Sequence, residues 1–395
     1  MSTFEALDGN SAVANAMRQI NPDVVAAYPI TPQTSTVQTF ANFVADGLVD
    51  TEFVCVESEH SAMSACVGAS SAGARVMTAT AANGMALMWE IMYIASSTRN
   101  HIVMSLVNRA LSGPINIHCD HSDSMGARDS GWIQLYSESG QEAYDNIIQA
   151  VRIAEHPDVL LPVMVCQDGF ITSHGMERVE LYDDADVKDF VGQYKPQWPL
   201  LDLENPKTYG PLDFYDYYYE HKRQQVLAME KATPVIQEVA AEFNARFGRD
   251  YGLFEAYKLK DAEVALVALN STAGTTKLVV DQLRDEGLKV GLLKPRVFRP
   301  FPGQALVEAL KHVKAIAVMD RSISFGIMDN SGPLFSELAA AFYVYGSQVP
   351  MVDYVYGLGG RDIMTREIES VFRAALKVAE TGQVERTVTF LGVRE

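Results

Sequence analysis

Two carboxylates and a histidine lie within seven residues of a stretch that is otherwise rich in small and apolar side chains. The sequence VESEHSA contains Glu57, Glu59 and His60, and it continues directly from the apolar run TEFVC. A carboxylate in apolar surroundings is costly to bury unless it has a partner or a chemical task. The stretch is therefore a candidate catalytic site. The alternative is an ordinary loop whose polar residues cap a helix or form surface ion pairs.

Three further polar segments follow apolar runs in the same way. YPITPQT contains Thr31, TATAANGMALM contains Asn83, and the long segment NRALSGPINIHCDHSD begins beside Arg109. Two prolines restrict the backbone on either side of Thr31, which gives its hydroxyl a defined direction. Asn83 precedes a glycine, and we expect this pair to cap or open the next helix. Ligands of open α/β sheets bind beyond the carboxyl ends of the strands, where all four segments would meet.

Together these segments contain the groups that one kind of chemistry needs. A buried carboxylate can hold a proton on a nitrogen heterocycle, and an arginine can bind a substrate carboxylate through two parallel hydrogen bonds. A loop rich in Gly and Asp can close over both. The spacing of the residues does not choose between this chemistry and a set of strand-end loops with helix caps and ion pairs.

The elements that must position these residues alternate between short apolar runs and Ala-rich helical patterns. Apolar runs that barely alternate, separated by helices, are typical of parallel sheets covered on both faces. The sequence therefore predicts an α/β fold with two doubly wound parallel-sheet domains. The strands expected in the first domain lie at 23–30, 51–56, 74–80, 101–107 and 160–166.

The expected domain boundaries follow shifts in composition. The first domain covers residues 1–245 and includes an excursion at 177–220 that is rich in Pro, Tyr and Asp and has no clear period. The second α/β domain covers 255–375, and a C-terminal tail covers 376–395. The second domain has no G-x-G-x-x-G sequence, so dinucleotide binding is not indicated. Its YGLGG segment is interpreted as a plain turn, with anion binding as the alternative.

Composition and charge exclude several classes of function. A formal net charge of −18 disfavours nucleic acid and anionic membrane surfaces as partners. The four cysteines form no CxxC pair, so we expect no iron–sulfur or metal site made by this chain alone. The first residues lack the basic and apolar regions of a secretory signal, and no apolar run is long enough to span a membrane. These features predict a cytoplasmic protein.

The four segments quoted above resemble the alpha subunits of pyruvate:ferredoxin oxidoreductases (pyruvate synthases). These belong to the thiamine-diphosphate-dependent 2-oxoacid:ferredoxin oxidoreductases. The similarity continues at RPFPGQAL, DRSISFG and GLGGRD, so it extends over nearly the whole chain. It implies a thiamine-diphosphate pyrimidine-type domain followed by a transketolase C-terminal-like domain.

The resemblance also implies roles for individual residues. Glu59 would hydrogen-bond the aminopyrimidine ring of the cofactor and favour the imino tautomer, which removes the proton from the thiazolium carbon. Arg109 would bind the carboxylate of the 2-oxoacid, and Thr31 would hydrogen-bond the same substrate. Glu57 and His60 would support Glu59 without reacting. The residues expected to contact the cofactor are Tyr28, Pro29, Ile30, Glu59 and Asn83.

The family reaction would need other chains. Thiamine enzymes hold the diphosphate through Mg²⁺ with a GDG…N motif. This chain has only a partial match to that motif, QDGF at 167–170. The resemblance therefore implies a beta subunit that supplies the diphosphate and Mg²⁺ site and a [4Fe-4S] cluster. Gamma or delta subunits would add further clusters, electrons would pass to ferredoxin, and coenzyme A would accept the acyl group. The reverse reaction would fix carbon dioxide.

Alternative functions remain open at this point. A threonine in YPIT favours pyruvate, whereas oxalate, 2-oxoglutarate and branched 2-oxoacids are other candidate substrates. A non-catalytic scaffold subunit and a transketolase-like transferase are further alternatives. His118, Asp120, His121 and Asp123 are residue types that bind metals, but the resemblance makes them part of an active-site loop.

Overall fold

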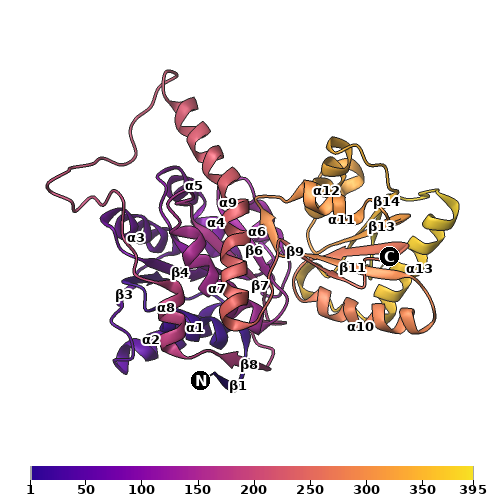
Figure 1. Ribbon diagram of the computed structural model, residues 1–395, viewed down its shortest axis with the longest axis horizontal. Helices are drawn as coiled ribbons and strands as arrows, with labels where there is room; N and C mark the ends of the chain where they lie inside the picture. The colour runs from indigo at the N-terminus through magenta and orange to yellow at the C-terminus, as the bar shows by residue number, and fades with distance from the viewer. Residues whose placement is uncertain (1, 395) are drawn as a thin grey trace.

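A seven-stranded sheet forms the core of the first half of the chain (Figure 1). The computed structural model describes residues 2–394. The strands, in spatial order, are β12 (Val297–Arg299), β6 (Ile133–Ser137), β7 (Val163–Asp168), β5 (Val103–Asn108), β4 (Val76–Thr80), β2 (Val24–Ala27) and β3 (Glu52–Cys55). All pairs are parallel except β12 with β6. Strands β4 to β7 are buried along their whole length, which explains why their sequences do not alternate.

Helices cover both faces of this sheet. One face carries α1 (Gly9–Ile20), α2 (Thr34–Ala45), α7 (Gly140–Ala154), α8 (Asp184–Val191) and the long helix α9 (Tyr218–Phe247). The other face carries α3 (Glu59–Ala72), α4 (Ala82–Leu87), α5 (Trp89–Ser97) and α6 (Ser122–Gly126). A separate two-stranded antiparallel sheet joins β1 (Thr3–Leu7) to β8 (Glu177–Leu181). None of the described helices has the combination of length and apolar composition that a membrane span requires.

The second half of the chain is built on a six-stranded sheet. Its order is β15 (Val388–Phe390), β14 (Met351–Val355), β13 (Ala315–Asp320), β10 (Val264–Ala268), β11 (Val290–Pro295) and β9 (Phe254–Tyr257), and only β9 is antiparallel. Alternate side chains of β10 enter two different cores: Leu266 packs with α10 (Thr272–Asp285) and α13 (Thr365–Thr381), whereas Val267 faces α11 (Gly303–Leu310) and α12 (Pro333–Val344). Two short 3₁₀ turns lie at η1 (Met328–Asn330) and η2 (Leu358–Gly360).

The two domains share a hydrophobic core, which fixes one against the other. A single cluster of buried side chains includes Met63 of α3 and Met92 of α5 together with Leu306 of α11 and Leu338 of α12. The two sheets lie side by side in Figure 1, with β9 and α6 near the boundary between them. The doubly wound α/β architecture predicted from the sequence is confirmed.

Three details differ from the sequence-based expectation. The apolar stretch KVGLLKPRVF predicts a single strand of the second domain, but it divides at Arg296, where the buried guanidinium donates to Asn146 and Gln149 of α7. Its second part, β12, therefore joins the sheet of the first domain. The excursion at 177–220 contains β8 and α8, so its irregular part is 192–217. The predicted tail contains the end of α13 and strand β15, which pairs with β14.

Candidate active site at the carboxyl edge of the first sheet

The four segments singled out in the sequence meet at one edge of the first sheet. Strands β5, β4, β2 and β3 are neighbours and run parallel, so the loops at their carboxyl ends lie next to one another. These loops carry Arg109, Asn83, Thr31 and Glu59, respectively. The sheet topology thus brings together residues that lie far apart in the sequence.

Glu59 is the first residue of α3, and its carboxylate is buried. The helix begins there because Ser58 caps it: the Ser58 hydroxyl accepts a hydrogen bond from the Ser61 backbone amide at 3.2 Å. The Glu59 side chain is 7% exposed. Among the described residues, it accepts no hydrogen bond and forms no ion pair. A carboxylate on so enclosed a residue, with no partner in the chain, points to a function that a ligand completes.

The backbone of α4 lies directly against this carboxylate. A Cβ added to Gly84 would stand 2.7 Å from Glu59 Oε1 and 2.5 Å from the Thr80 hydroxyl, so any side chain there would fill the space beside Glu59. The Thr80 hydroxyl is itself buried and has no hydrogen-bond partner among the described residues. Two unpartnered polar groups therefore border one small space, which suits a ring with its own donors and acceptors.

Arg109 is held by two backbone carbonyls. Its Nη1 donates to Thr31 O at 2.9 Å and its Nε donates to Asn116 O at 3.0 Å. The side chain is 6% exposed, and Nη2 has no partner among the described residues. The structure thus brings Arg109 and Thr31 together, through the threonine carbonyl. It leaves a free guanidinium nitrogen that can bind an anion.

Asp123 organises the loops around Arg109, a role that the sequence did not reveal. This carboxylate accepts from the backbone amides of Ala82 (3.1 Å) and Arg109 (3.0 Å), and from Asn108 Nδ2 (2.8 Å). It thereby joins the start of α4 to the end of β5. Burial raises the pKa of Asp123 to about 6, although the Asn108 and Arg109 hydrogen bonds oppose that shift.

Asn83 does not cap a helix, so that part of the expectation is wrong. The residue before α4 is Ala81, and Asn83 lies in the first turn, where the exposed side chain accepts from the Ser112 amide (3.3 Å) and hydroxyl (3.1 Å). Asn83 therefore connects α4 to the loop after Arg109. Tyr28 and Pro29 are exposed, and Ile30 is half-buried, so these residues form the rim of the site.

Glu57 and His60 have local partners. Glu57 is exposed and accepts a hydrogen bond from the Ser61 hydroxyl at 2.7 Å, and that bond lowers the pKa of the carboxyl group. His60 is partly exposed, and its Nε2 lies 3.8 Å from a carboxylate oxygen of Glu90. Unlike Glu59, both residues are at least partly exposed and have a partner within the chain.

The aspartate of QDGF serves the junction between the domains. Asp168 is fully buried at the end of β7, where it accepts from His121 Nε2 (2.8 Å), Asn270 Nδ2 (2.9 Å) and Arg321 Nη1 (3.2 Å). Burial alone would raise the pKa of Asp168, but the Arg321 guanidinium and the His121 ring hold it well below its usual range. Its oxygens are thus bonded to His121 of the first domain and to Asn270 and Arg321 of the second.

The cluster around Asp168 includes two residues of the HCDHSD segment, Cys119 and His121. Cys119, His121 and Asp168 have ligand atoms within 4.8 Å of one another, a grouping that suits a metal ion by residue type. The Arg321 guanidinium, however, already supplies the positive charge that balances Asp168. Of the four residues considered in the sequence, only His121 takes part. The group is therefore an ion-pair junction, while Asp123 serves the loops around Arg109.

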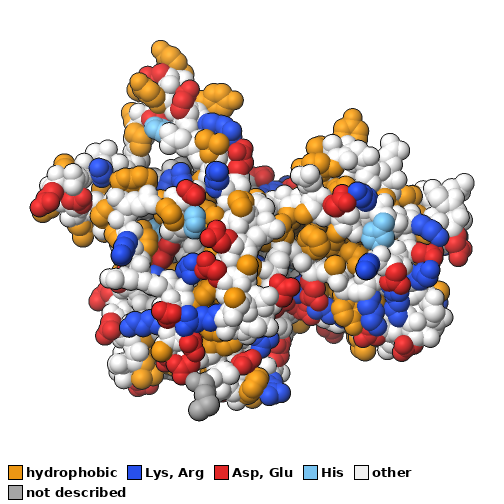
Figure 2. All heavy atoms as spheres, viewed as in Figure 1, with side chains coloured by type: hydrophobic (Ala, Val, Ile, Leu, Met, Phe, Trp, Pro, Cys, Tyr) orange, Lys and Arg blue, Asp and Glu red, His pale blue; other side chains and the backbone are white. Residues whose placement is uncertain are grey.

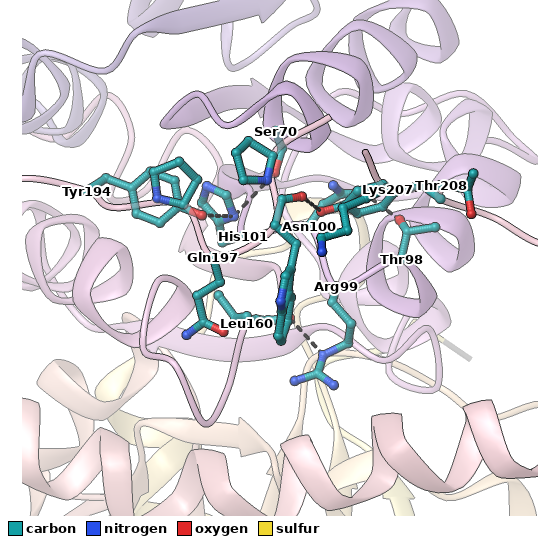
Figure 3. Close-up of a pocket in the computed structure, with 14 residues that line it drawn as sticks. Ser70, Thr98, Arg99, Asn100, His101, Leu160, Tyr194, Gln197, Lys207 and Thr208 are labelled. Carbon is teal, nitrogen blue, oxygen red and sulfur yellow. Dashed lines mark hydrogen bonds between the residues drawn. The ribbon is translucent and has the colours of Figure 1, made fainter. Parts of the chain in front are cut away.

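A separate cavity lies at the opposite, amino-terminal end of the first sheet (Figure 3). Its volume is about 310 Å³, and it is lined by the residues that precede β5, including Arg99 and His101, and by Tyr194 and Lys207 of the irregular segment. None of the predicted site residues lines it. The His101 ring is buried there and contacts the Ser70 and Tyr194 hydroxyls, as Figure 3 shows.

Comparisons with known proteins agree with this arrangement. Residues 15–241 match the family model described as pyruvate flavodoxin/ferredoxin oxidoreductase, thiamine diphosphate-binding. Residues 262–368 match core domain II of pyruvate:ferredoxin oxidoreductase. A pyruvate synthase subunit PorA from Thermotoga maritima is 59% identical over 99% of this chain and 98% of its own length. A ketoisovalerate oxidoreductase subunit VorA from Pyrococcus horikoshii is 44% identical over 97% and 96%.

Solved structures of low sequence identity share the fold. A 2-oxoglutarate:ferredoxin oxidoreductase from Magnetococcus marinus aligns with a TM-score of 0.73 at 20% identity, over 94% of this chain and 65% of that one. A split-gene transketolase aligns with a TM-score of 0.55 at 12% identity, over 95% of this chain and 100% of that one. With both domains matched in order and full-length relatives at high identity, this chain belongs to the thiamine-diphosphate-binding pyruvate flavodoxin/ferredoxin oxidoreductase family.

Proposed function

We propose that this chain is the alpha subunit of a 2-oxoacid:ferredoxin oxidoreductase. The reaction is the reversible, coenzyme A-dependent oxidative decarboxylation of pyruvate, and the electrons pass to ferredoxin. The observation that carries this proposal is the buried, unpartnered Glu59 carboxylate on one strand-end loop, with Arg109 on another. Full-length relatives named pyruvate synthase subunits support the choice of reaction.

The residues present fit the pyrimidine half of thiamine diphosphate. The cofactor supplies a nucleophilic carbon and an electron sink. Glu59 holds a proton at a ring nitrogen, and the Thr80 hydroxyl is free to bond a second ring atom beside Gly84. Arg109 Nη2 binds the carboxylate of the 2-oxoacid, and the enclosure of both side chains strengthens these charged hydrogen bonds.

The rest of the cofactor site belongs, in this proposal, to other subunits. The only partial match to a diphosphate motif, QDGF, has its aspartate bound to Arg321 and Asn270. Cys66, Cys119 and Cys166 are buried, and burial raises the pKa of each thiol, which suits structural thiols better than cluster ligands. A beta subunit would bring the diphosphate and Mg²⁺ site, and iron–sulfur subunits would carry the [4Fe-4S] clusters. The free thiols fit a reducing compartment such as the cytoplasm.

Pyruvate is the proposed substrate, and other 2-oxoacids are the alternative. A relative named for ketoisovalerate is 44% identical, close to the 43–49% of several relatives named for pyruvate. Turnover of the assembled complex on pyruvate, ketoisovalerate, 2-oxoglutarate and oxalate distinguishes these cases. A higher kcat/KM for any of the other three acids than for pyruvate would overturn the substrate assignment.

The catalytic role is tested by Glu59→Gln in the assembled complex, with Glu57→Gln as the matched control. Proton transfer by a positioned carboxyl contributes about 10²–10⁴-fold, so Glu59→Gln should lower pyruvate-dependent ferredoxin reduction by at least about a hundredfold. The control removes an exposed carboxylate two residues away, on the same loop, and should leave the rate unchanged. Equal rates in both variants would show that this subunit is a scaffold.

A further inference from the structure

The glycine turn of the second domain packs against the loop that follows Arg109. Asn116 Nδ2 donates to Gly359 O at 3.0 Å, and the Gly359 amide donates to Asp120 Oδ2 at 3.3 Å. The two partners of the first bond lie 243 residues apart in the sequence. The YGLGG segment forms the turn predicted from the sequence, and this turn is also a contact between the domains beside the candidate active site.

The fit between turn and loop leaves no space for larger residues. A Cβ at Gly359 would lie 2.4 Å from Asn116 Nδ2, and a Cβ at Gly360 would lie 2.3 Å from His118 Cβ. Both glycines also have positive φ angles, 63° and 79°, which other residues rarely adopt. Loop and turn thus hold each other in one relative position.

Asn116 connects this contact to the guanidinium of Arg109. Its side-chain oxygen accepts from the His118 amide at 2.7 Å, so both ends of the Asn116 amide are bonded. Its backbone carbonyl accepts from Arg109 Nε at 3.0 Å. With Thr31 O bonded to Nη1, two fixed carbonyls define the plane of the guanidinium. The direction of the free Nη2 then depends on where Asn116 lies.

We propose that Asn116, anchored by the glycine turn of the second domain, is a positioning residue for Arg109 and sets the affinity for the 2-oxoacid. This inference rests on the proposed function. The second domain, which places none of its own side chains among the predicted catalytic residues, then contributes to substrate binding through the Gly359 backbone, which holds the Asn116 side-chain amide. Asn116 itself acts only through Arg109.

The first test is Asn116→Ala in the assembled complex. The backbone carbonyl remains, but both bonds that fix it are lost, and a displacement of about 1 Å at a binding group costs up to about a hundredfold. We expect the KM for pyruvate to rise between about tenfold and a hundredfold, with a smaller change in kcat. The KM for ferredoxin should stay the same, which separates loss of positioning from general damage.

The second test uses two glycines with matched backbone strain. Gly359 and Gly382 have φ angles of 63° and 68°, yet a Cβ meets Asn116 only at Gly359, because nothing lies within 4 Å at Gly382. Gly359→Ala should therefore raise the KM for pyruvate, whereas Gly382→Ala should not, even if both lower the unfolding temperature equally. This pair still decides the question if Asn116→Ala fails to fold.

The outcomes separate the two proposals. If the wild-type complex oxidises pyruvate but Gly359→Ala and Gly382→Ala have the same KM, the positioning role of Asn116 is wrong and the proposed function stands. If the wild-type complex oxidises none of the tested 2-oxoacids, the proposed function fails and the positioning role fails with it. A raised KM in Asn116→Ala and Gly359→Ala alone supports both.

Discussion

The side chains at the two ends of the first sheet differ in burial and in the number of partners they bond. At the carboxyl edge, the side chains of Arg109, Asp123 and Asp168 are buried and bonded to partners from several elements, including the second domain. At the amino end, the irregular segment 192–217 extends over the body, and large apolar side chains such as Leu203 (89% exposed) and Tyr215 (98% exposed) face outward. Figure 2 shows hydrophobic side chains on the projecting end of α9, which continues from this segment.

This difference separates what the chain specifies alone from what it leaves to a partner. The carboxyl edge is a closed network in which almost every buried charge has a partner, and Glu59 is the exception that a cofactor would complete. The segment 192–217 has few bonds to the body, among them Leu200 N to Ser71 O at 2.8 Å. Extended segments with exposed apolar residues are typical of surfaces that other chains cover.

The largest effect is expected from Asp168→Ala, which breaks the carboxyl edge. Removing one partner of a buried ion pair leaves the Arg321 guanidinium uncompensated, which costs about 3–5 kcal/mol of unfolding free energy. Chemical denaturation of the chain measures this loss. Asp186→Ala removes an aspartate that pairs with Arg246 on the surface, and it should cost less than about 1 kcal/mol. Similar losses in the two variants would contradict the proposed importance of the junction.

The second prediction concerns pH. A buried histidine at the amino end and a buried aspartate at the carboxyl edge change the unfolding free energy in opposite directions as pH falls. Burial lowers the pKa of His101, at the amino end, from 6.5 to about 4. As pH falls below 6.5, the unfolded chain binds a proton that the native ring does not, so stability is lost as pH falls from about 6.5 to 4. Asp123, at the carboxyl edge, has a pKa raised from 3.8 to about 6, so its contribution is lost as pH rises through that window.

His101→Gln separates these contributions. A shift from 6.5 to about 4 corresponds to about 3 kcal/mol, at about 1.4 kcal/mol for each pKa unit. Between pH 6.5 and 4, the unfolding free energy of the wild type should therefore fall by about 3 kcal/mol more than that of the variant. His60→Gln, which removes a partly exposed ring on the surface of α3, should retain the wild-type difference. A parallel pH profile in wild type and His101→Gln would refute the assignment.

The sequence predicted four of the strands of the first sheet from apolar runs that are largely buried, but not β6, which is buried as completely. Apolar runs such as ARVMTAT became β4 because a parallel strand covered on both faces needs apolar side chains at every position. Strand β6 was missed because its residues stand in a polar segment between turns. The separation of β12 from β11 was missed because it depends on Arg296 reaching α7, a contact across 150 residues.

The same distinction applies to the site. Glu59, Arg109 and Thr31 were singled out from local segments that resemble a family, and the parallel sheet brings these segments together. The roles of Asp123, Asp168 and Asn116 depend on partners from other loops or from the second domain. No local pattern encodes such pairs. A carboxylate at the end of a buried strand, as in QDGF, is the one sequence signal for Asp168, and it does not distinguish a residue of the domain junction from a partial diphosphate motif.

The third prediction tests the geometry of the carboxyl edge at Arg109. Arg109→Lys keeps the charge but cannot bond Thr31 O and Asn116 O while presenting a free nitrogen to an anion. We expect kcat/KM for pyruvate in the assembled complex to fall about a hundredfold, which corresponds to about 3 kcal/mol. Arg128→Lys, which alters an arginine of the same segment that donates to Met125 O, is the control and should retain activity. Full activity in Arg109→Lys would show that charge alone suffices.

The smallest effect is expected at the other end of the comparison, from Leu203→Ser. Leu203 is almost fully exposed, so its replacement removes no buried contact within the chain and should change the unfolding free energy by less than about 0.5 kcal/mol. Leu266→Ser, at a fully buried position of β10, is the matched control and should cost several kcal/mol, because it leaves a cavity and buries a hydroxyl. Thermal unfolding of the chain measures both. A large loss in Leu203→Ser would mean that the segment 192–217 packs on its own domain more firmly than its exposure indicates, and the contrast between the two ends of the sheet would then disappear.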